Sequence, residues 1–258
     1  MNYLENTQLL KKFKVLLVGD NCVDIYRYGT VDRISPEAPV PVFKFLYEDR
    51  KPGMAANVLA NLEAFGVEVN AYLGTPSEKT RLIDVKSRQH IVRIDNDVVS
   101  DPVKFESVGD SQLYDAVVIS DYNKGYVSYQ NIKDLISKYP CPIFVDSKKP
   151  DLQQFNGCFV KINEKEYNER ASSTDNVIVT LGSEGAMYKG KIYSTEKTEV
   201  VDVCGAGDTF LAALVFQYLN TKNIEDAIHF ANLAGAISVQ HSGVYTLTNQ
   251  DIENIKKI

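Results

Sequence analysis

The chain has 258 residues, of which 44% are hydrophobic, 24% charged and 10% aromatic. This composition is typical of a folded globular protein and excludes a disordered, collagen-like or disulfide-framed chain. The formal net charge of −6 disfavours nucleic acid as a partner. No run approaches the roughly 18 apolar residues that span a bilayer, and the start lacks the order of a signal peptide. We therefore expect a cytoplasmic protein that contacts no membrane.

The four cysteines and three histidines stand apart along the chain. No two cysteines form a C-x-x-C pair, and no spacing among these residues matches a zinc site. We interpret the cysteines as small buried side chains in a reducing compartment. The chemistry is therefore expected from other residue types.

Short apolar, β-branched runs alternate with helix-length segments, which is the pattern of a mostly parallel sheet covered by helices. The expected strands are Lys14–Gly19, Val67–Leu73, Ala116–Ser120, Ile143–Asp146, Cys158–Ile162 and Val177–Leu181. Their near-continuous apolar character fits strands that are buried on both faces. The clearest helices are Gly53–Phe65, Asp208–Leu219 and Ile224–Val239. The fold class is therefore α/β.

A proline-rich stretch precedes the strand-like run Val42–Tyr47. Since proline cannot donate a hydrogen bond to a central ladder, this run is an edge or excursion strand. We expect a small β lid outside the main sheet, around residues 25–50. Residues 80–95 are a second candidate for the lid, because the connection from Leu73 to the strand-like run Arg81–Val85 is too short for a parallel crossover. The chain must there turn back antiparallel or leave the sheet.

The strongest signal for a functional site is a glycine-containing turn between the strand-like run Glu199–Val203 and the helix expected from Asp208. It reads Asp202-Val203-Cys204-Gly205-Ala206-Gly207-Asp208-Thr209-Phe210. Gly205 and Gly207 let backbone amides approach a ligand closely, and a helix N-terminus offers free N–H groups and partial positive charge to phosphate oxygens. The turn therefore indicates phosphate binding, with Asp208 placed to accept a hydroxyl proton.

Phosphoryl transfer needs such positioning, charge stabilisation and one carboxylate that orients the attacking hydroxyl. A plain turn with Asp208 as a helix-capping residue explains the same letters without any function. Two other nucleotide-binding motifs are disfavoured. Phe210 stands where a dinucleotide fingerprint has its third glycine, and no G-x-x-x-x-G-K-[ST] sequence occurs.

This turn resembles the C-terminal signature of the ribokinase-like (PfkB) carbohydrate kinases. Further stretches resemble the kinase domain of the bifunctional heptose-7-phosphate kinase/ADP-heptose synthases within that family. They are Val18-Gly19-Asp20 with Asp24, Tyr28-Gly29 with the run Arg33–Val42, Lys51–Val58 and Ser120–Gly125. The resemblance covers the chain from about Lys14 onward. It implies one three-layer ribokinase-like domain over residues 1–258, with a mostly parallel central sheet, flanking helices and a small β lid.

The resemblance implies a role for each matching position. The catalytic positions are Asp208 as the base and Gly205, Ala206 and Gly207 as the anion hole. The sugar-binding positions are Asp24, Gly53 and Asn57. Discrete polar contacts of this kind distinguish one polyol from another. Without the resemblance, Asp24 can be read as a cap and Asn57 as a buried polar group.

The implied cofactors are ATP, Mg²⁺ and, near His241-Ser242-Gly243, a candidate monovalent cation. The nucleotide-binding positions are Thr180, Gly182, Gly185 and Asn232. Asn163 and Glu166 match a motif that organises Mg²⁺ indirectly, through water. Thr180, Gly182 and Gly185 can also be interpreted as a plain strand–turn–strand. Asn163 and Glu166 can also be interpreted as a helix-capping pair.

Several cations fall in the lid region, namely Arg33, Arg50, Lys51, Arg81, Arg88 and Arg93. A sugar that already carries a phosphate needs such groups, although solvated surface charge explains most lysines and arginines. Asp121 and Lys124 follow a strand end, where open α/β sheets bind ligands, and neither receives a role.

The chain also departs from the family pattern. Two segments are shorter by about one helix each, after Leu73 and over Arg170–Asn176, so we expect the lid and the edge of the sheet to differ from the family pattern. Single-residue departures are Met54 for a second glycine, Ile25 for an arginine and Ser147 for a proline. The chain ends near the end of the kinase region, so we expect no nucleotidyltransferase half.

Three functions remain open. The first is an ATP-dependent kinase for the anomeric hydroxyl of a heptose 7-phosphate or similar phosphosugar, which would feed nucleotide-heptose synthesis. The second is a kinase of the same fold for another sugar, and the third is a non-catalytic module that binds a nucleotide or sugar phosphate. An exposed lid strand is a natural pairing edge, so a homodimer through the lid is a further hypothesis.

Overall fold

The computed structural model describes residues 12–104 and 114–257. Residues 1–11, in which we expect no signal peptide, lie outside the described part, as do residues 105–113 and 258. Among the described residues, no helix combines the length and apolar character needed to cross a membrane.

The larger of two β-sheets has eight strands in the order β12-β11-β10-β9-β8-β7-β1-β4. Its parallel strands are β1 (Lys14–Gly19), β4 (Glu68–Leu73), β7 (Ala116–Asp121), β8 (Ile143–Ser147), β9 (Phe159–Asn163) and β10 (Val177–Thr180). The hairpin of β11 (Ala186–Tyr188) and β12 (Lys191–Tyr193) extends the sheet antiparallel. The strands expected from buried apolar runs are confirmed, each with ends that differ by at most one residue.

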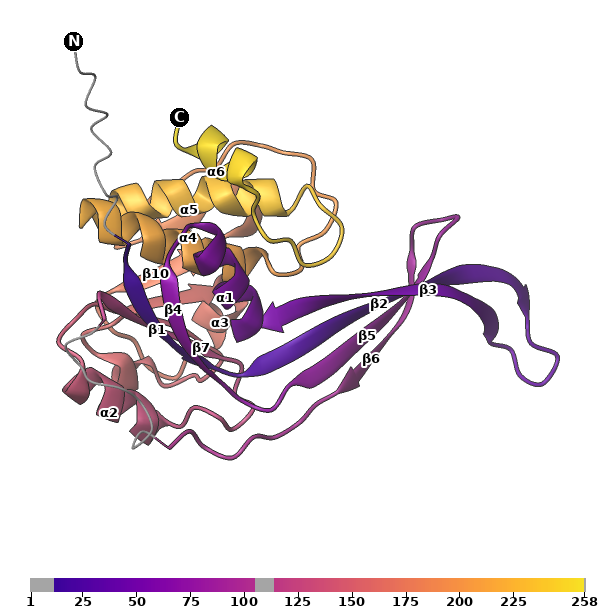
Figure 1. The fold of residues 1–258 in the computed structure, drawn as a ribbon, viewed down its shortest axis with the longest axis horizontal. Coiled ribbons are helices and arrows are strands. Elements are labelled where there is room, and N and C mark those ends of the chain that lie inside the picture. The colour runs from indigo at the N-terminus through magenta and orange to yellow at the C-terminus, as the bar shows by residue number, and fades with distance from the viewer. Residues whose placement is uncertain (1–11, 105–113, 258) are drawn as a thin grey trace, which may run out of the picture.

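Helices cover both faces of this sheet, as Figure 1 shows. On one face lie α1 (Ala55–Ala64), α4 (Ala206–Thr221) and α5 (Ile224–Ser238), and α6 (Asn249–Ile255) packs on α5. On the other face lie α2 (Tyr129–Lys138) and the short 3-10 helix η3 (Leu152–Phe155). Strand β1 divides the two cores, since Val15 and Leu17 pack on the first side and Leu16 and Val18 on the second. The expected three-layer α/β fold is confirmed.

The three expected helices are confirmed with shifted ends. The helix expected over Gly53–Phe65 begins at Ala55, because Gly53 and Met54 complete a strand. The helix expected from Asp208 begins two residues earlier, at Ala206. Small residues let α4 and α5 approach closely, and those without exposed surface include Ala212, Ala213, Ala231 and Ala234.

The smaller sheet is the lid, which projects from the main sheet as a long arm (Figure 1). It has four strands in the order β3-β2-β5-β6, and their bounds are β2 (Asn21–Ile34), β3 (Pro41–Met54), β5 (Ser77–Asp84) and β6 (His90–Asn96). The run Val42–Tyr47 lies in β3, at an edge of the sheet as expected. After β4 the chain leaves the main sheet and enters β5, which pairs parallel with β2. Of the two expected alternatives, an antiparallel return within the main sheet or a departure from it to the lid, the departure is therefore confirmed.

The two connections that the sequence indicates as short are short in the structure. Three residues separate β4 from β5, and between β9 and β10 the chain forms α3 (Glu164–Glu169) followed by a loop. The strand expected over Glu199–Val203 is wrong, because this segment is an extended loop. The amides of Val201 and Asp202 donate to the carbonyl of Val239 at 2.8 and 3.1 Å, so the end of α5 replaces a neighbouring strand as the partner.

Candidate functional site

The glycine-containing turn leads directly into α4. Gly205 is the N-terminal cap of α4 and has a left-handed backbone with φ of 77°, which costs a glycine little. A Cβ on Gly205 would lie 2.7 Å from Asn57 Nδ2, and one on Gly207 would lie 2.7 Å from Lys161 Nζ. Position 205 therefore favours glycine through both its backbone and its contact with Asn57, whereas at position 207 a Cβ would have to displace the end of the Lys161 side chain.

The expected anion hole is only partly available within this turn. The amide of Ala206 donates to the Val203 carbonyl at 3.3 Å, and the amide of Asp208 donates to the Gly205 carbonyl at 3.0 Å. Among the described residues, no acceptor for the amides of Gly205 and Gly207 occurs. These two N–H groups are the better candidates for binding a phosphate oxygen.

The carboxylate of Asp208 lies in the interior, with 3% of the residue exposed. Tyr122 Oη donates to Oδ1 at 2.8 Å, and Asn57 Nδ2 donates to Oδ2 at 3.1 Å. Burial, followed by the negative charge of Asp146, raises the pKa of Asp208 to about 6, whereas the two hydrogen bonds act in the opposite direction. A carboxylate with this pKa suits proton transfer near neutral pH.

Two lysines lie near the turn, Lys161 of β9 and Lys148, which directly follows β8. Lys161 Nζ is 2.7 Å from Asp146 Oδ2, and both side chains are buried. Lys148 Nζ is 2.5 Å from Glu166 Oε1 and 3.7 Å from Asp146 Oδ1. Although burial lowers the pKa of Lys148, the charges of Asp146 and Glu166 raise it to about 12. Lys148 therefore stays positively charged beside a proposed phosphate site.

Asn163 and Glu166 form a reciprocal capping box at the start of α3, with both hydrogen bonds at 2.9 Å. Glu166 also pairs with Lys148, yet carboxylate oxygens keep further lone pairs. Asp146 Oδ1 is buried and has no hydrogen-bond partner among the described residues. Within residues 12–104 and 114–257, no cluster of three His, Cys, Asp or Glu residues could bind a metal directly. The donors fit Mg²⁺ held through water.

The expected sugar-binding residues lie where the lid joins the main sheet. Asp24 of β2 and Arg81 of β5 form an ion pair at 2.5 Å, and each side chain is 7% exposed. A Cβ on Gly53 of β3 would lie 2.0 Å from Asp24 Oδ2, so Gly53 leaves room for that carboxylate. Of the six cations expected on the lid, Arg81 alone is buried.

The four expected nucleotide-binding residues line one cavity of about 690 Å³. They are Thr180, Gly182 and Gly185, around the short helix η4 (Gly182–Glu184), and Asn232 of α5. Ala206 and Gly207 border the same cavity. Val200, Val203 and Phe210 add apolar surface to the lining, and the segment 195–198 adds polar and charged side chains. A cavity that combines apolar surface with several polar groups suits the base and ribose of a nucleotide, and this one opens beside the proposed phosphate site.

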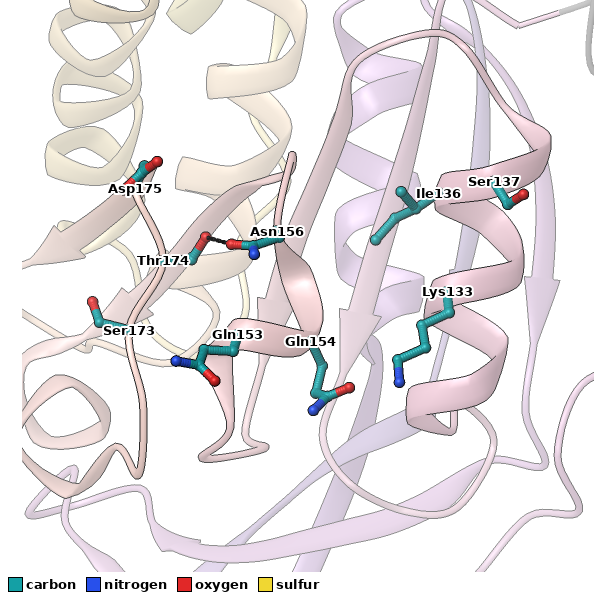
Figure 2. A pocket seen from close by; sticks show the side chains of 9 residues that line it. All are labelled: Lys133, Ile136, Ser137, Gln153, Gln154, Asn156, Ser173, Thr174 and Asp175. Carbon is teal, nitrogen blue, oxygen red and sulfur yellow. Dashed lines mark hydrogen bonds between the residues drawn. The ribbon is translucent and has the colours of Figure 1, made fainter.

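A second cavity, of about 850 Å³, lies elsewhere and is shown in Figure 2. It is lined by mostly polar residues of α2, of the region around η3 and of the segment 173–175. Thr174 donates to Asn156 across part of it at 2.7 Å. None of the expected site residues lines this cavity. The cavity of about 690 Å³, although it is smaller than this one, is therefore the better candidate for a ligand site.

The loop at 241–243, where a monovalent cation was expected, forms hydrogen bonds both with the lid and with the segment that precedes α4. The amide of Gly243 donates to Asp202 Oδ2 at 2.9 Å, and Lys51 Nζ of the lid donates to the Ser242 carbonyl at 3.2 Å. The role of this loop in cation binding stays a prediction.

Sequence reasoning missed Tyr122, Lys148 and Lys161. A lysine inside the apolar strand β9 was a signal for Lys161, because lysine is almost never buried without a partner. Asp121, which received no role, pairs with Lys149 at 2.8 Å and accepts a hydrogen bond from Ser147 at 2.6 Å. The serine that replaces a proline at position 147 therefore stabilises the end of β7.

Comparison with known proteins gives two kinds of match. Residues 158–251 match the family described as pfkB family carbohydrate kinase. Proteins named bifunctional protein HldE match over nearly the whole chain. The one from Campylobacter curvus is 34% identical over 96% of this chain, and the one from Nitratiruptor sp. is 32% identical over 95%. The chain spans 66% and 65% of the lengths of these two relatives.

Solved structures of ribokinase-like kinases share the fold. The chain matches a ribokinase from Thermotoga maritima with a TM-score of 0.70 at 18% identity, covering 95% of this chain and 100% of the other. Phosphofructokinase-2 from Escherichia coli, in complex with substrates and products, matches with a TM-score of 0.69 at 16% identity, covering 95% and 98%. The ribokinase-like fold expected from the sequence is confirmed.

Proposed function

The chain carries a pfkB-family carbohydrate kinase domain, and from this premise we propose that it is a sugar kinase with ATP as the phosphoryl donor. The observation that carries the proposal is the position of the turn at the start of α4, between a cavity and a buried carboxylate. Through Ala206 and Gly207 the turn borders the cavity that contains all four proposed nucleotide-binding residues. The next residue of the turn, Asp208, lies outside the lining of that cavity and is a buried carboxylate with a raised pKa.

The proposed reaction is a direct transfer. The sugar hydroxyl gives its proton to Asp208, its oxygen attacks the γ-phosphorus, and the bond from that phosphorus to the bridging oxygen breaks to release ADP. Gly205 and Gly207 would hold the transferring group through their amides, and Lys148 and Lys161 would offset its charge. Mg²⁺, held through water by Asn163 and Glu166, would supply further charge neutralisation when bound. With ATP as the donor, the proposal implies a cytoplasmic protein.

For the acceptor we propose the anomeric hydroxyl of a heptose 7-phosphate or a similar phosphosugar. Support comes from the sequence resemblance to the heptose-7-phosphate kinase domain and from Arg81, a buried cation beside Asp24. Asp24, Gly53 and Asn57 would bind the sugar. A different sugar is the second candidate, because Met54 and Ile25 replace residues usual in the subfamily beside the proposed pocket.

A non-catalytic binding module is the third candidate. Two observations favour it, namely the helix-sized shortenings and the contacts from Tyr122 and Asn57 that enclose Asp208. Turnover decides between this module and a kinase, because a module releases no ADP.

An ADP-release assay against a panel of sugars and sugar phosphates tests the proposal. We expect turnover with a heptose 7-phosphate, and Asp208→Asn should reduce kcat by about 10²- to 10⁴-fold, as loss of a general base does. Asp226→Asn is the matched control, because Asp226 is an exposed acidic residue in the first turn of α5. Equal activity of Asp208→Asn and the wild type would refute the role of Asp208. Absence of turnover with every sugar would favour the binding module.

We also propose that two copies associate through their lids, with an edge strand of one lid pairing with an edge strand of the other. Phe45 and Tyr47 on the edge strand β3 are 57% and 54% exposed, and Ile94 on β6 is 51% exposed. Large apolar side chains exposed on an edge strand mark a surface through which a second copy could pair.

A further inference from the structure

The segment 121–126 is held around one buried carboxylate. Asp20, which follows β1, is 1% exposed. Its Oδ2 accepts the amides of Tyr122 and Lys124 at 2.7 and 3.0 Å, and its Oδ1 accepts the amide of Tyr126 at 3.3 Å. Three hydrogen bonds to one carboxylate fix this backbone firmly. The result is a rigid support for the side chain of Tyr122.

The side chain of Tyr122 reaches from this support to the proposed base. Its hydroxyl donates to Asp208 Oδ1 at 2.8 Å. Its ring lies near two cations from other parts of the chain, with Lys148 Nζ at 5.1 Å and Lys79 Nζ at 5.6 Å from the ring centroid. Cations over a tyrosine face attract the ring. Because Lys79 belongs to β5, the lid itself contributes to the placement of Tyr122.

We propose that Tyr122 is a positioning residue that orients the carboxylate of Asp208 toward the sugar hydroxyl. This inference rests on the proposed kinase function. Asn57 holds Oδ2 and Tyr122 holds Oδ1, so the plane of the carboxylate is set from both sides. Each oxygen keeps a second lone pair with which to accept the proton. Burial raises the pKa of Tyr122 well above its ordinary value, so its hydroxyl stays protonated and remains a donor.

The pKa of Asp208 depends on the hydrogen bond from Tyr122 and can therefore be used to detect it. Asp146 of β8 raises its pKa, and Lys161 of β9 and the donors Tyr122 and Asn57 lower it. Lys148, beyond Tyr122, also interacts with its charge. Because Tyr122 donates to the charged carboxylate, its removal should raise the pKa of Asp208 further. A role confined to packing would leave that pKa unchanged.

The test is the variant Tyr122→Phe, which removes only the hydroxyl. The carboxyl resonance of Asp208 can be followed by ¹³C NMR in protein labelled at aspartate, where its absence from Asp208→Asn identifies it. We expect a midpoint near 6 in the wild type and a rise of about one unit in the variant. The acidic limb of kcat/KM should shift in the same direction, with the KM for ATP within about twofold of the wild type.

Tyr126→Phe is the matched control, since Tyr126 lies in the same segment and its amide shares the Asp20 carboxylate. It should leave the Asp208 midpoint and the acidic limb in place. A midpoint that stays unmoved in folded Tyr122→Phe overturns the inference, whatever the activity. A wild-type chain without turnover on any sugar overturns the proposed function instead, and the NMR titration separates the two failures.

Discussion

Gly205 shows how one position serves both the fold and the proposed chemistry. Two independent features disfavour a side chain at this position. The backbone φ is 77°, and an added Cβ would lie 2.7 Å from Asn57 Nδ2. Gly205→Ala should therefore lose about 2 kcal/mol or more of unfolding free energy, since left-handed backbone strain alone costs about 1 kcal/mol or more. Turnover should fall as well, because Asn57 also holds Asp208. Urea denaturation and the ADP-release assay measure the two effects.

Gly190 offers a matched control for that prediction. Its φ is also 77°, yet nothing lies within 4 Å of an added Cβ. Gly190→Ala should show the backbone strain alone and keep its activity. If the two variants lose equal stability and both stay active, the contact with Asn57 does not explain why position 205 is a glycine.

At the same scale, local sequence predicted some site residues and missed others. Asp208 and its glycines adjoin one another in the chain, so their chemistry was readable from a single segment. Tyr122 and Lys148 reach the same place from the ends of other strands, β7 and β8. Their meeting depends on the order of strands in the sheet, which local sequence does not encode.

The lid strands provide a prediction at the scale of elements. Arg81→Met leaves Asp24 buried without its partner, which should cost roughly 3 kcal/mol of unfolding free energy. Because β5 brings Arg81 to the proposed sugar site, the KM for the sugar should rise by about tenfold or more, with the KM for ATP nearly unchanged. Steady-state kinetics with each substrate varied in turn measures this difference.

Arg93 is the matched control for Arg81. It lies opposite Arg81 on β6, but its side chain is 50% exposed and its pairing with Asp95 is a surface contact. Arg93→Met should change stability by less than about 1 kcal/mol and leave both KM values unchanged. Equal effects of the two substitutions on the sugar KM would show that Arg81 has no special place in the site.

Elements were predicted well where burial decides them and poorly elsewhere. The strands β1 and β7 to β10 are apolar on both faces, and their ends were predicted to within one residue. The run Glu199–Val203 has the same β-branched letters, but Val200, Val201 and Val203 are exposed, and Val200 and Val203 border the nucleotide-side cavity. Exposed apolar side chains that line a cavity give the same sequence pattern as a strand.

On the scale of the whole molecule, the lid is an arm whose length the sequence only partly indicated. β2 and β3 each run for 14 residues, beyond the boundaries expected from the proline-rich stretch. Their pairing passes through two irregularities in register, where side-chain alternation breaks and the pattern becomes hard to read. In the lid, β3 and β6 are both open edges, and an open edge gains hydrogen bonds when a strand of a second copy pairs with it.

This shape leads to the prediction about assembly. Tyr47→Asp places a charge on the exposed apolar surface of the lid, where burial against a second copy would be costly. The wild type should have twice the mass of the chain by light scattering, and the variant the mass of one chain. Ile192→Asp is the matched control, since Ile192 on β12 has the same exposure, 54%, at the far edge of the main sheet. A wild type of single-chain mass, or a Tyr47→Asp variant that stays dimeric, would contradict association through the lid.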